Sequence, residues 1–287
     1  MTVLVLGENG QLAMHLREVL PQAAFWGRRT LDLARPAAVA DAISALRPTA
    51  IVNAAGYTAV DKAESEPDLA WRVNAESVAA VARTANALGV PLVHVSTDYV
   101  FDGTKTGEYE EGDALNPVSV YGVTKAAGEL AVRALCPSAW VLRVSWLFSE
   151  HGANFMKTML RLAATLDELR VVDDQRGRPT YAGQFAQLVA RLIERGESDV
   201  TYGVYHAVGG PVVSWRDFAL ATMKRAHERG LLPRQPPVRG IRTSEYPTAA
   251  RRPANSALRP SAALERLGVA LDWSAGLDEA LGRLAKT

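Results

Sequence analysis

Tyr121 and Lys125 stand four positions apart and carry a phenol and an ammonium group, which together can transfer a proton. On a helix, this spacing places the two groups on one face, about one turn apart. A phenol with a pKa of about 10 is a weak acid at neutral pH, and a nearby cation lowers that pKa by favouring the phenolate. The pair is a candidate for general acid–base catalysis. Such pairs also arise by chance, so the surrounding elements must support this interpretation.

Hydroxyl-bearing residues lie upstream of the pair. The segment Val93–Phe101 begins as a buried strand and continues into Ser96, Thr97 and Asp98. Open α/β sheets bind ligands at the carboxyl ends of their strands. We therefore expect Thr97 and Asp98 to lie beside a ligand.

A glycine-containing turn, Gly7-Glu8-Asn9-Gly10-Gln11-Leu12-Ala13, follows the strand pattern Val3–Leu6 and leads into a helix. Glycines there allow a tight turn and a close approach to a pyrophosphate, and the helix N-terminus offers unpaired N–H groups. The spacing Gly-x-x-Gly-x-x-Ala is one residue longer at its start than the dehydrogenase fingerprint, which indicates a different Rossmann subgroup. An ordinary βα turn is the alternative.

Two arginines follow the expected second strand, which ends near Phe25-Trp26. The chain continues Gly27-Arg28-Arg29, where many dinucleotide sites place an acid on the adenine ribose. Guanidinium groups bind a 2′-phosphate well, so Arg28 and Arg29 favour NADPH, although Asp32 leaves NADH possible. A solvated basic turn is the alternative interpretation.

The elements that position these residues alternate along the first half of the chain. Apolar strand patterns cover Val3–Leu6, Ala50–Asn53, Leu92–Ser96 and Ala139–Val144, and amphipathic helix patterns cover Gln11–Leu20, Ala37–Leu46, Leu69–Leu88 and Val123–Ala134. Continuously apolar strands alternating with such helices predict an α/β fold, a Rossmann-type doubly wound parallel sheet covered on both faces.

The alternation loosens after Ser145, and six prolines fall within 229–260. We predict that residues 1–150 form an NADP(H)-binding domain and that 151–169 and 209–287 form a smaller substrate domain. Residues of about 170–208 are expected to return to the first domain, because Gly183–Arg195 fits a helix and Val204–Val208 a buried strand.

Composition excludes several classes of protein. The 287 residues are 48 % hydrophobic and 22 % charged, with 32 basic against 31 acidic side chains. This balance is typical of a globular protein and offers no field for nucleic acid or anionic membranes. No apolar run reaches the roughly 18 residues of a membrane span, and the first residues fit a buried strand better than a signal peptide. A single cysteine, Cys136, agrees with a cytoplasmic location.

Longer sequence motifs indicate which family of proteins the chain resembles. The glycine turn, the strand end and the Tyr/Lys helix, in this order, resemble the extended short-chain dehydrogenase/reductases. The segments 53–64, 96–103, 143–148, 174–180 and 251–256 resemble signatures of the dTDP-4-dehydrorhamnose reductase family. The resemblance implies NAD(P)H-dependent reduction of the C4 ketone of dTDP-4-dehydro-L-rhamnose to dTDP-L-rhamnose.

The resemblance also implies site residues. Tyr121 would be the proton donor, Lys125 its partner and a ligand of the nicotinamide ribose, and Thr97 the third catalytic residue. Cofactor contacts are expected from Gly7, Gly10, Gln11, Leu12, Arg28, Arg29, Asp32, Leu33, Ala54, Ala55, Gly56, Tyr121 and Lys125. Substrate contacts are expected from Thr97, Asp98, Trp146, Asn154 and Arg252. Trp146 directly follows the strand Ala139–Val144 and its neighbour Ser145, so the carboxyl-end rule supports its place.

Some features depart from the family pattern. Ala13 replaces a glycine, Gly56 an alanine, and Arg176 stands where the family has an aromatic or small residue, in a loop that could touch the sugar. A sibling 4-ketoreductase for another dTDP-deoxysugar is therefore an alternative. A non-catalytic regulatory subunit of the methionine adenosyltransferase type is a second, although the intact Thr97, Tyr121 and Lys125 set argues against it. The five histidines lack metal-ligand spacing, so no metal is predicted. The oligomeric state is expected to be a monomer or homodimer.

Overall fold

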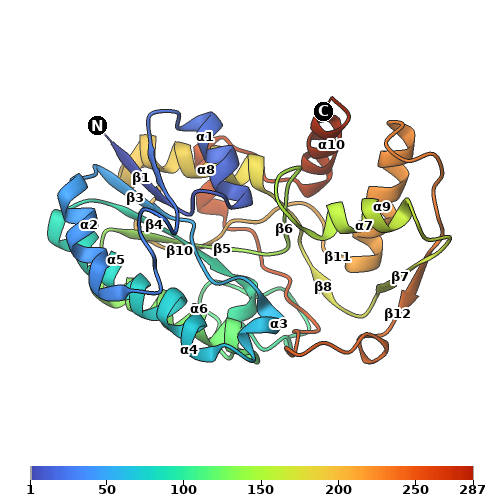
Figure 1. Ribbon diagram of the computed structural model, residues 1–287, viewed down its shortest axis with the longest axis horizontal. Coiled ribbons are helices and arrows are strands. Elements are labelled where there is room, and N and C mark those ends of the chain that lie inside the picture. Colours follow the sequence, from blue (N-terminus) through green and yellow to red (C-terminus); the bar gives the residue numbers. More distant parts are fainter. Residues whose placement is uncertain (1, 287) are drawn as a thin grey trace.

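A parallel sheet of six strands forms the centre of the larger lobe in this computed structural model, which describes residues 2–286 (Figure 1). The strands are β1 (Val3–Leu6), β2 (Ala24–Trp26), β3 (Ala50–Asn53), β4 (Leu92–Thr97), β5 (Ala139–Val144) and β10 (Gly203–His206). They lie in the order β10-β5-β4-β3-β1-β2, so the chain reverses its direction of travel across the sheet between β1 and β3. The predicted doubly wound α/β fold is confirmed, and this reversal is where such sheets bind ligands.

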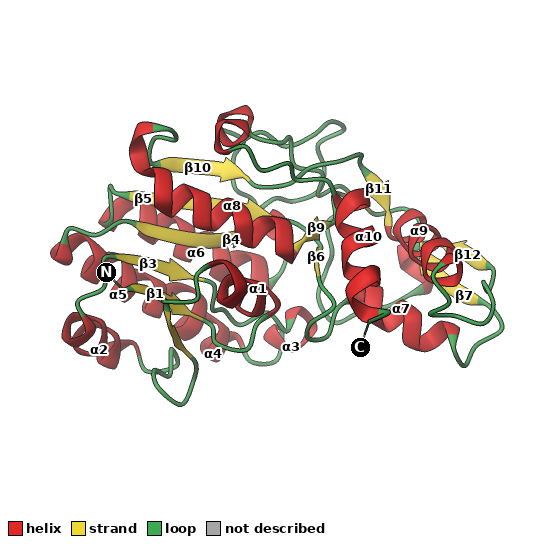
Figure 2. Ribbon diagram, turned by 90° about the horizontal axis from the view of Figure 1, so that it is seen from above, coloured by secondary structure: helices red, strands yellow, loops and turns green. Residues whose placement is uncertain are grey.

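Helices cover both faces of the sheet (Figures 1 and 2). One face carries α1 (Gln11–Val19) and α8 (Ala182–Arg195); the other carries α2 (Val39–Leu46), α5 (Ser77–Leu88) and α6 (Val120–Leu135). Shorter helical segments are η1 (Pro36–Ala38), α3 (Val60–Ala63), α4 (Pro67–Trp71), η3 (Asp98–Val100) and η4 (Gly196–Ser198). Within residues 2–286, no helix combines the length and apolarity needed to cross a membrane.

Two helices differ from their sequence patterns in ways that affect the site. The expected helix 69–88 contains a π-helical turn, η2 (Arg72–Glu76), between α4 and α5. Helix α6 begins at Val120, three residues earlier than expected. The Ser119 hydroxyl accepts a hydrogen bond from the Gly122 N–H at 3.1 Å, and the Glu64 carboxylate accepts one from the Val120 N–H at 2.9 Å. These two caps place Tyr121 inside the first helical turn.

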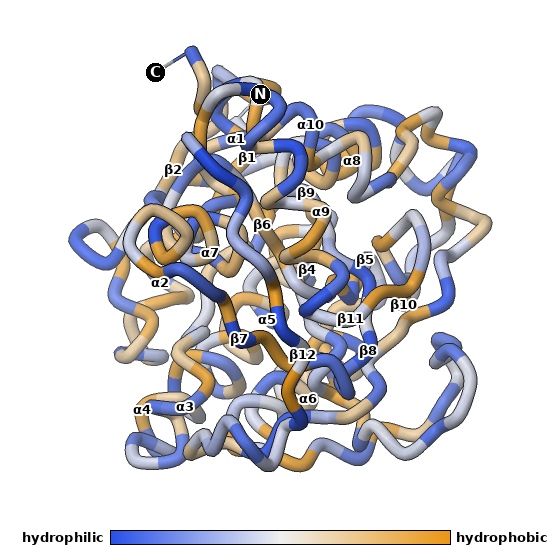
Figure 3. Tube along the Cα trace, turned by 90° about the vertical axis from the view of Figure 1, so that its right-hand side faces the viewer, coloured by the Kyte–Doolittle hydropathy of each residue, from blue (hydrophilic) through white to orange (hydrophobic). Residues whose placement is uncertain are grey.

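The smaller lobe packs three helices against short strand pairs. Its helices are α7 (Phe155–Ala163), α9 (Trp215–Glu228) and α10 (Trp273–Leu284); its strand pairs are β6 (Leu147–Phe148) with β9 (Thr180–Tyr181), β7 (Leu169–Val172) with β12 (Val238–Ile241), and β8 (Arg176–Gly177) with β11 (Val213–Ser214). The 3-10 segments η5 (Thr243–Glu245) and η6 (Ala262–Leu267) complete the chain. Figure 3 looks onto this lobe and shows β7 and β12 changing between hydrophobic and hydrophilic residues. Their apolar side chains join a core with Phe148 and Phe218.

The chain crosses between the lobes more often than the sequence predicts. Helix α8 and strand β10 return to the large sheet, but residues 170–181 do not, because β7 pairs with β12 in the smaller lobe. Segment η6 crosses back again, and its Leu264 and Leu267 pack in the core beneath α8. These crossings connect the lobes along one side of the sheet.

Candidate active site

A continuous groove follows the carboxyl edge of the large sheet and extends between the lobes. Its first part, the turn cavity, has a volume of about 300 Å³ and is lined by the glycine turn and the residues after β2 and β3. Its second part, the central cavity, has a volume of about 640 Å³ and reaches the ends of β4 and β5 and the start of α7. Both cavities are lined by Gly10, Ala54, Ala55, Gly56 and Thr58, so one extended ligand can occupy them together.

The glycine turn has the geometry that a phosphate requires. Gly7 has φ +109°, and a Cβ at this position would lie 3.0 Å from the Ala54 backbone, so only glycine fits. Gly10 caps α1 without any side-chain hydrogen bond, which leaves the N–H groups of the first helical turn for a ligand. The residues present therefore fit a dinucleotide pyrophosphate.

The basic segment after β2 only partly enters the groove. Arg28 lines the turn cavity, together with Asp32 and Leu33, and its Nε lies 4.0 Å from the Asp32 carboxylate. Arg29 is exposed and is not among the residues that line this cavity. The Asp32 carboxylate also accepts a hydrogen bond from the Ala34 N–H at 3.0 Å, so it stabilises the loop.

Tyr121, Lys125 and Thr97 meet in the central cavity. The Tyr121 ring is buried edge-to-face against Tyr99, with 5.5 Å between ring centroids. Lys125 Nζ donates a 2.7 Å hydrogen bond to the Val95 carbonyl, and the Thr97 hydroxyl donates one of 2.9 Å to Asp98. The three side chains that the sequence predicted to act together are thus brought to one wall of the cavity.

Burial is the main cause of the pKa shifts of Tyr121 and Lys125, and for Tyr121 the shift is opposite to the one expected from the sequence. The pKa of Tyr121 is raised above its ordinary value by burial, and the Thr97 hydroxyl opposes this effect. We expected Lys125 to draw this pKa down, which is wrong for the protein alone: burial sets the direction of the shift, and the Lys125 ammonium bonds to the Val95 carbonyl. A raised pKa keeps the phenol protonated at neutral pH, and it also makes the phenol a weaker acid than a free tyrosine. Burial also lowers the pKa of Lys125 to about 8, with Glu129 opposing.

Asp98 is nearly inaccessible, at 2 % exposed, and one of its oxygens lacks a hydrogen-bond partner among residues 2–286. Burial raises the pKa of this carboxyl to about 6. A buried polar atom without a partner costs free energy unless a ligand satisfies it. Asp98 lines the central cavity, so a substrate hydroxyl is a suitable partner.

Trp146 lies half-buried at the far wall of the central cavity with a strained backbone. It has φ +50°, and its indole stacks on Trp215 with 3.6 Å between centroids and planes 7° apart. A Cβ on Gly177 would lie 2.5 Å from the indole, so glycine is needed beside it. One indole face is therefore covered by Trp215 rather than free, and positive φ at a tryptophan is typical of functional sites.

Sequence reasoning missed an aromatic extension of the site. A third cavity of about 380 Å³, the outer cavity, adjoins the central one and shares Tyr99, Phe155, Trp215 and Arg252 with it. Tyr246 and Arg170 complete its aromatic and cationic lining. These residues lie in five separate segments, and of them only Arg252 was expected from a sequence motif.

Two predicted substrate residues also hold the lobes together. Arg252 donates to the Asp61 carboxylate at 2.8 Å, which anchors the segment after η5 to α3. Asn154 caps α7 by accepting from the Lys157 N–H at 3.0 Å and donates to the Gln11 side chain at 2.8 Å. Both lie at the central cavity. Arg176 pairs with Asp217 at the surface, outside the residues that line the central and outer cavities.

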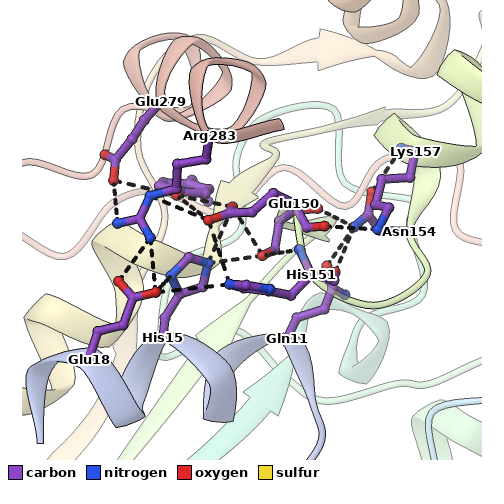
Figure 4. A network of polar contacts seen from close by, with 11 residues as sticks. Gln11, His15, Glu18, Glu150, His151, Asn154, Lys157, Glu279 and Arg283 are labelled. Carbon is purple, nitrogen blue, oxygen red and sulfur yellow. Dashed lines mark hydrogen bonds and ion pairs between the residues drawn. The ribbon is translucent and has the colours of Figure 1, made fainter. Parts of the chain in front are cut away.

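A polar cluster beside this junction ties three segments together (Figure 4). His15 and Glu18 come from α1, Glu150 and His151 from the link to α7, and Arg283 from α10. Ligand atoms of His15, Glu150 and His151 lie within 4.8 Å of one another, which the positions of these residues in the sequence could not reveal. The guanidinium of Arg283 lies 3.4 Å from Glu150 and 2.9 Å from Glu18, so a cation of the chain itself neutralises these carboxylates.

The fold and the site together define an oxidoreductase of the short-chain dehydrogenase/reductase class. A glycine turn at the reversal of a parallel sheet and a buried hydroxyl, phenol and ammonium set are the features of that class. The family model described as "RmlD substrate binding domain" matches residues 1–286. A dTDP-4-dehydrorhamnose reductase from Aggregatibacter actinomycetemcomitans is 42 % identical over 284 residues, which cover 96 % of each chain. The chain belongs to the dTDP-4-dehydrorhamnose reductase family.

Solved structures agree with this assignment. A dTDP-4-dehydrorhamnose reductase from Clostridium acetobutylicum matches with a TM-score of 0.91 and 35 % identity over 99 % of both chains. One from Bacillus anthracis, in complex with NADP, matches with a TM-score of 0.88 and 33 % identity, covering 98 % of this chain and 99 % of that one. The chain is thus an enzyme, and the alternative of a non-catalytic regulatory subunit is not supported.

Proposed function

We propose that this enzyme works in the cytoplasm and uses NADPH to reduce the C4 ketone of dTDP-4-dehydro-L-rhamnose, giving dTDP-L-rhamnose. The observation that carries the proposal is the meeting of Thr97, Tyr121 and Lys125 in a cavity that continues into the glycine turn. Family membership supports the substrate, and the NADP complex of one relative supports the cofactor.

The larger lobe would hold the cofactor and the smaller lobe would close over the nucleotide sugar. The turn cavity, with Gly7, Gly10, Arg28, Asp32 and Leu33, would take the adenosine and phosphates. Ala54, Ala55 and Gly56 connect it to the central cavity, where Gln11, Leu12 and Lys125 complete the lining. NADPH bound there supplies the hydride for the ketone.

Residues of the central cavity would stabilise the negative charge that develops on the ketone oxygen and would supply the proton to it. As negative charge grows on the carbonyl oxygen, the neutral Tyr121 phenol is suited to protonate it. Lys125 stabilises the phenolate left behind, and Thr97 holds the oxygen in line by its hydroxyl. Asp98, with its unpartnered oxygen, would accept a sugar hydroxyl.

The outer cavity is suited to the nucleotide end of the substrate. Phe155, Trp215 and Tyr246 offer aromatic faces for a base, and Arg170 and Arg252 offer cations for a diphosphate. Trp146 would then lie between base and ketone, against the 6-deoxy sugar.

The test is consumption of NADPH, followed as loss of its absorbance, when purified protein receives dTDP-4-dehydro-L-rhamnose. We expect saturable turnover, and no consumption with dTDP-L-rhamnose, which has no ketone. Turnover that is equally fast with a free keto sugar would contradict the proposed nucleotide site.

Arg28 and Arg29 lead to a prediction about cofactor preference. Replacing both by alanine should reduce the ratio of kcat/KM for NADPH over NADH, mainly by weakening NADPH. A charge-assisted pair with phosphate contributes roughly 1.5 to 3 kcal/mol, and exposure of Arg28 argues for the low end, about tenfold. Arg28→Ala alone should give most of the effect. Arg35→Ala, an exposed arginine outside the turn cavity, is the control. Equal use of both cofactors by the wild type would refute this preference.

Trp146 leads to a prediction about the substrate. Trp146→Ala should lower kcat/KM for the nucleotide sugar at least about tenfold while NADPH affinity is kept. The stack on Trp215 contributes roughly 0.5–1.5 kcal/mol beyond the burial of its area. Because the indole is only half-buried, Tm should fall by less than the roughly 3 to 5 kcal/mol cost of removing a core tryptophan would give. Trp71→Ala, at an exposed tryptophan outside the cavities, is the matched control. A much larger loss of Tm with unchanged kinetics would show that Trp146 is only a core residue.

A further inference from the structure

A buried ion pair lies directly behind the catalytic wall. Glu129 is 0 % exposed and Arg143 is 1 % exposed. Arg143 donates to both oxygens of Glu129, through a close contact from Nη2 and a hydrogen bond of 3.1 Å from Nε. Removing two charges from water costs about as much as their attraction returns, so an apolar pair could stabilise the core equally well. A role in catalysis would explain the charges.

Glu129 connects the two elements that carry the site. It lies one helical turn after Lys125 on α6, where residues four apart share a face. It also accepts a 2.9 Å hydrogen bond from Ser96 on β4. Ser96 stands between Val95, whose carbonyl holds Lys125 Nζ, and Thr97. One carboxylate therefore fixes the end of β4 against α6.

We propose that Glu129 is a positioning residue for the reductase, which keeps Lys125 in its ammonium form and holds the β4 end to which Lys125 and Thr97 belong. The proposal rests on the catalytic role proposed for Lys125. Glu129 itself does not line the central cavity, so it acts through these neighbours.

The titratable groups around Lys125 do not change charge in the pH range where Lys125 itself loses its proton. Burial lowers the pKa of His94 on β4 well below its ordinary value, and lowers that of His206 on β10 to about 4. Both imidazoles are therefore neutral above pH 6. Asp98 in η3 has a raised pKa of about 6, and Tyr121 remains protonated, so neither changes charge near pH 8. Arg143 on β5 pairs with Glu129.

The direction of the effect follows from these charges. Burial lowers the pKa of Lys125 to about 8, and the Glu129 anion opposes that change. Without the anion, the ammonium form should lose its proton at a lower pH. Activity that needs the ammonium form then declines earlier as the pH rises.

The experiment compares pH profiles of kcat/KM and of NADPH binding between about pH 6 and 9. In Glu129→Gln, we expect the alkaline limb of both profiles to move down by at least about half a pH unit, which is the scale of a nearby buried charge. Glu129→Asp retains the charge and should keep the limb near that of the wild type, even if its Tm is lower. Glu194→Gln, an exposed carboxylate on α8, is the control and should leave the profile unchanged.

Each alternative has a distinct result. A uniform loss at every pH in Glu129→Gln, or an equal shift in Glu129→Asp, would overturn the proposal in favour of packing alone. If Glu129→Gln does not fold, the double variant Glu129→Gln/Arg143→Gln leaves no unpaired buried charge. Its alkaline limb should move in the same direction by a smaller amount, because loss of the Arg143 cation offsets part of the loss of the Glu129 anion. If Lys125→Met keeps the alkaline limb of the wild type, Lys125 is not the group that titrates there, and its proposed catalytic role is wrong. If Lys125→Met loses this limb but Glu129→Gln leaves its position unchanged, the role of Lys125 stands and the positioning role of Glu129 is wrong.

Discussion

Tyr121→Phe is expected to lower kcat by about two to four orders of magnitude, the range for loss of a general acid. The substitution removes the hydroxyl and keeps the ring that packs against Tyr99. Burial keeps the phenol protonated, so it enters the reaction in the form that can donate a proton. NADPH affinity and Tm should change little.

Steady-state kinetics and cofactor titration of the variant give this result. Tyr57→Phe is the matched control, because it removes a tyrosine hydroxyl that bonds to Glu66 rather than one at the catalytic wall. We expect the control to keep wild-type turnover. If kcat of Tyr121→Phe stays within a few-fold of the wild-type value, Tyr121 is not the proton donor.

Lys125→Met is expected to damage both turnover and cofactor binding. The ammonium group is buried at the cavity wall, where it can stabilise a phenolate and bond to the nicotinamide ribose. Because the charge serves two partners, its loss should lower kcat and weaken NADPH binding by about ten- to a hundredfold each, the range for loss of a charge-assisted hydrogen bond. Methionine keeps the length of the side chain, so packing is largely preserved.

Single-turnover rates and NADPH titrations separate the two effects. Lys62→Met, at an exposed lysine paired with Glu66, is the control. A change in only one of the two parameters for Lys125→Met would mean that the dual role is wrong.

The central architecture follows from local patterns. The strands β1, β3 and β5 have the predicted bounds, and β4 is one residue longer, because fully buried parallel strands give continuous apolar runs. The glycine turn and the Tyr121/Lys125 pair were also found from the sequence, since their spacing is set by one element each. The catalytic role expected for Thr97 and the substrate contact expected for Trp146 came from the resemblance to the family.

Contacts between distant segments could not be predicted in this way. The stack of Trp146 on Trp215 joins two lobes, and the bond of Asp61 to Arg252 joins α3 to a loop late in the chain. Neither has a periodic pattern, because each depends on how the lobes pack. The pKa of Tyr121 was misjudged for the same reason, since burial and the bond from Lys125 to the strand appear only in the folded protein.

The configuration at C4 of the product distinguishes the proposed reaction from that of a sibling ketoreductase. The enzyme should be incubated with dTDP-4-dehydro-L-rhamnose and NADPH, and the product sugar identified by NMR. We expect dTDP-L-rhamnose, formed in equal amount to the NADPH consumed. A product with the opposite C4 configuration, as in a talose-type sugar, would show that the site belongs to a sibling ketoreductase, and no product at all would contradict the proposed reaction.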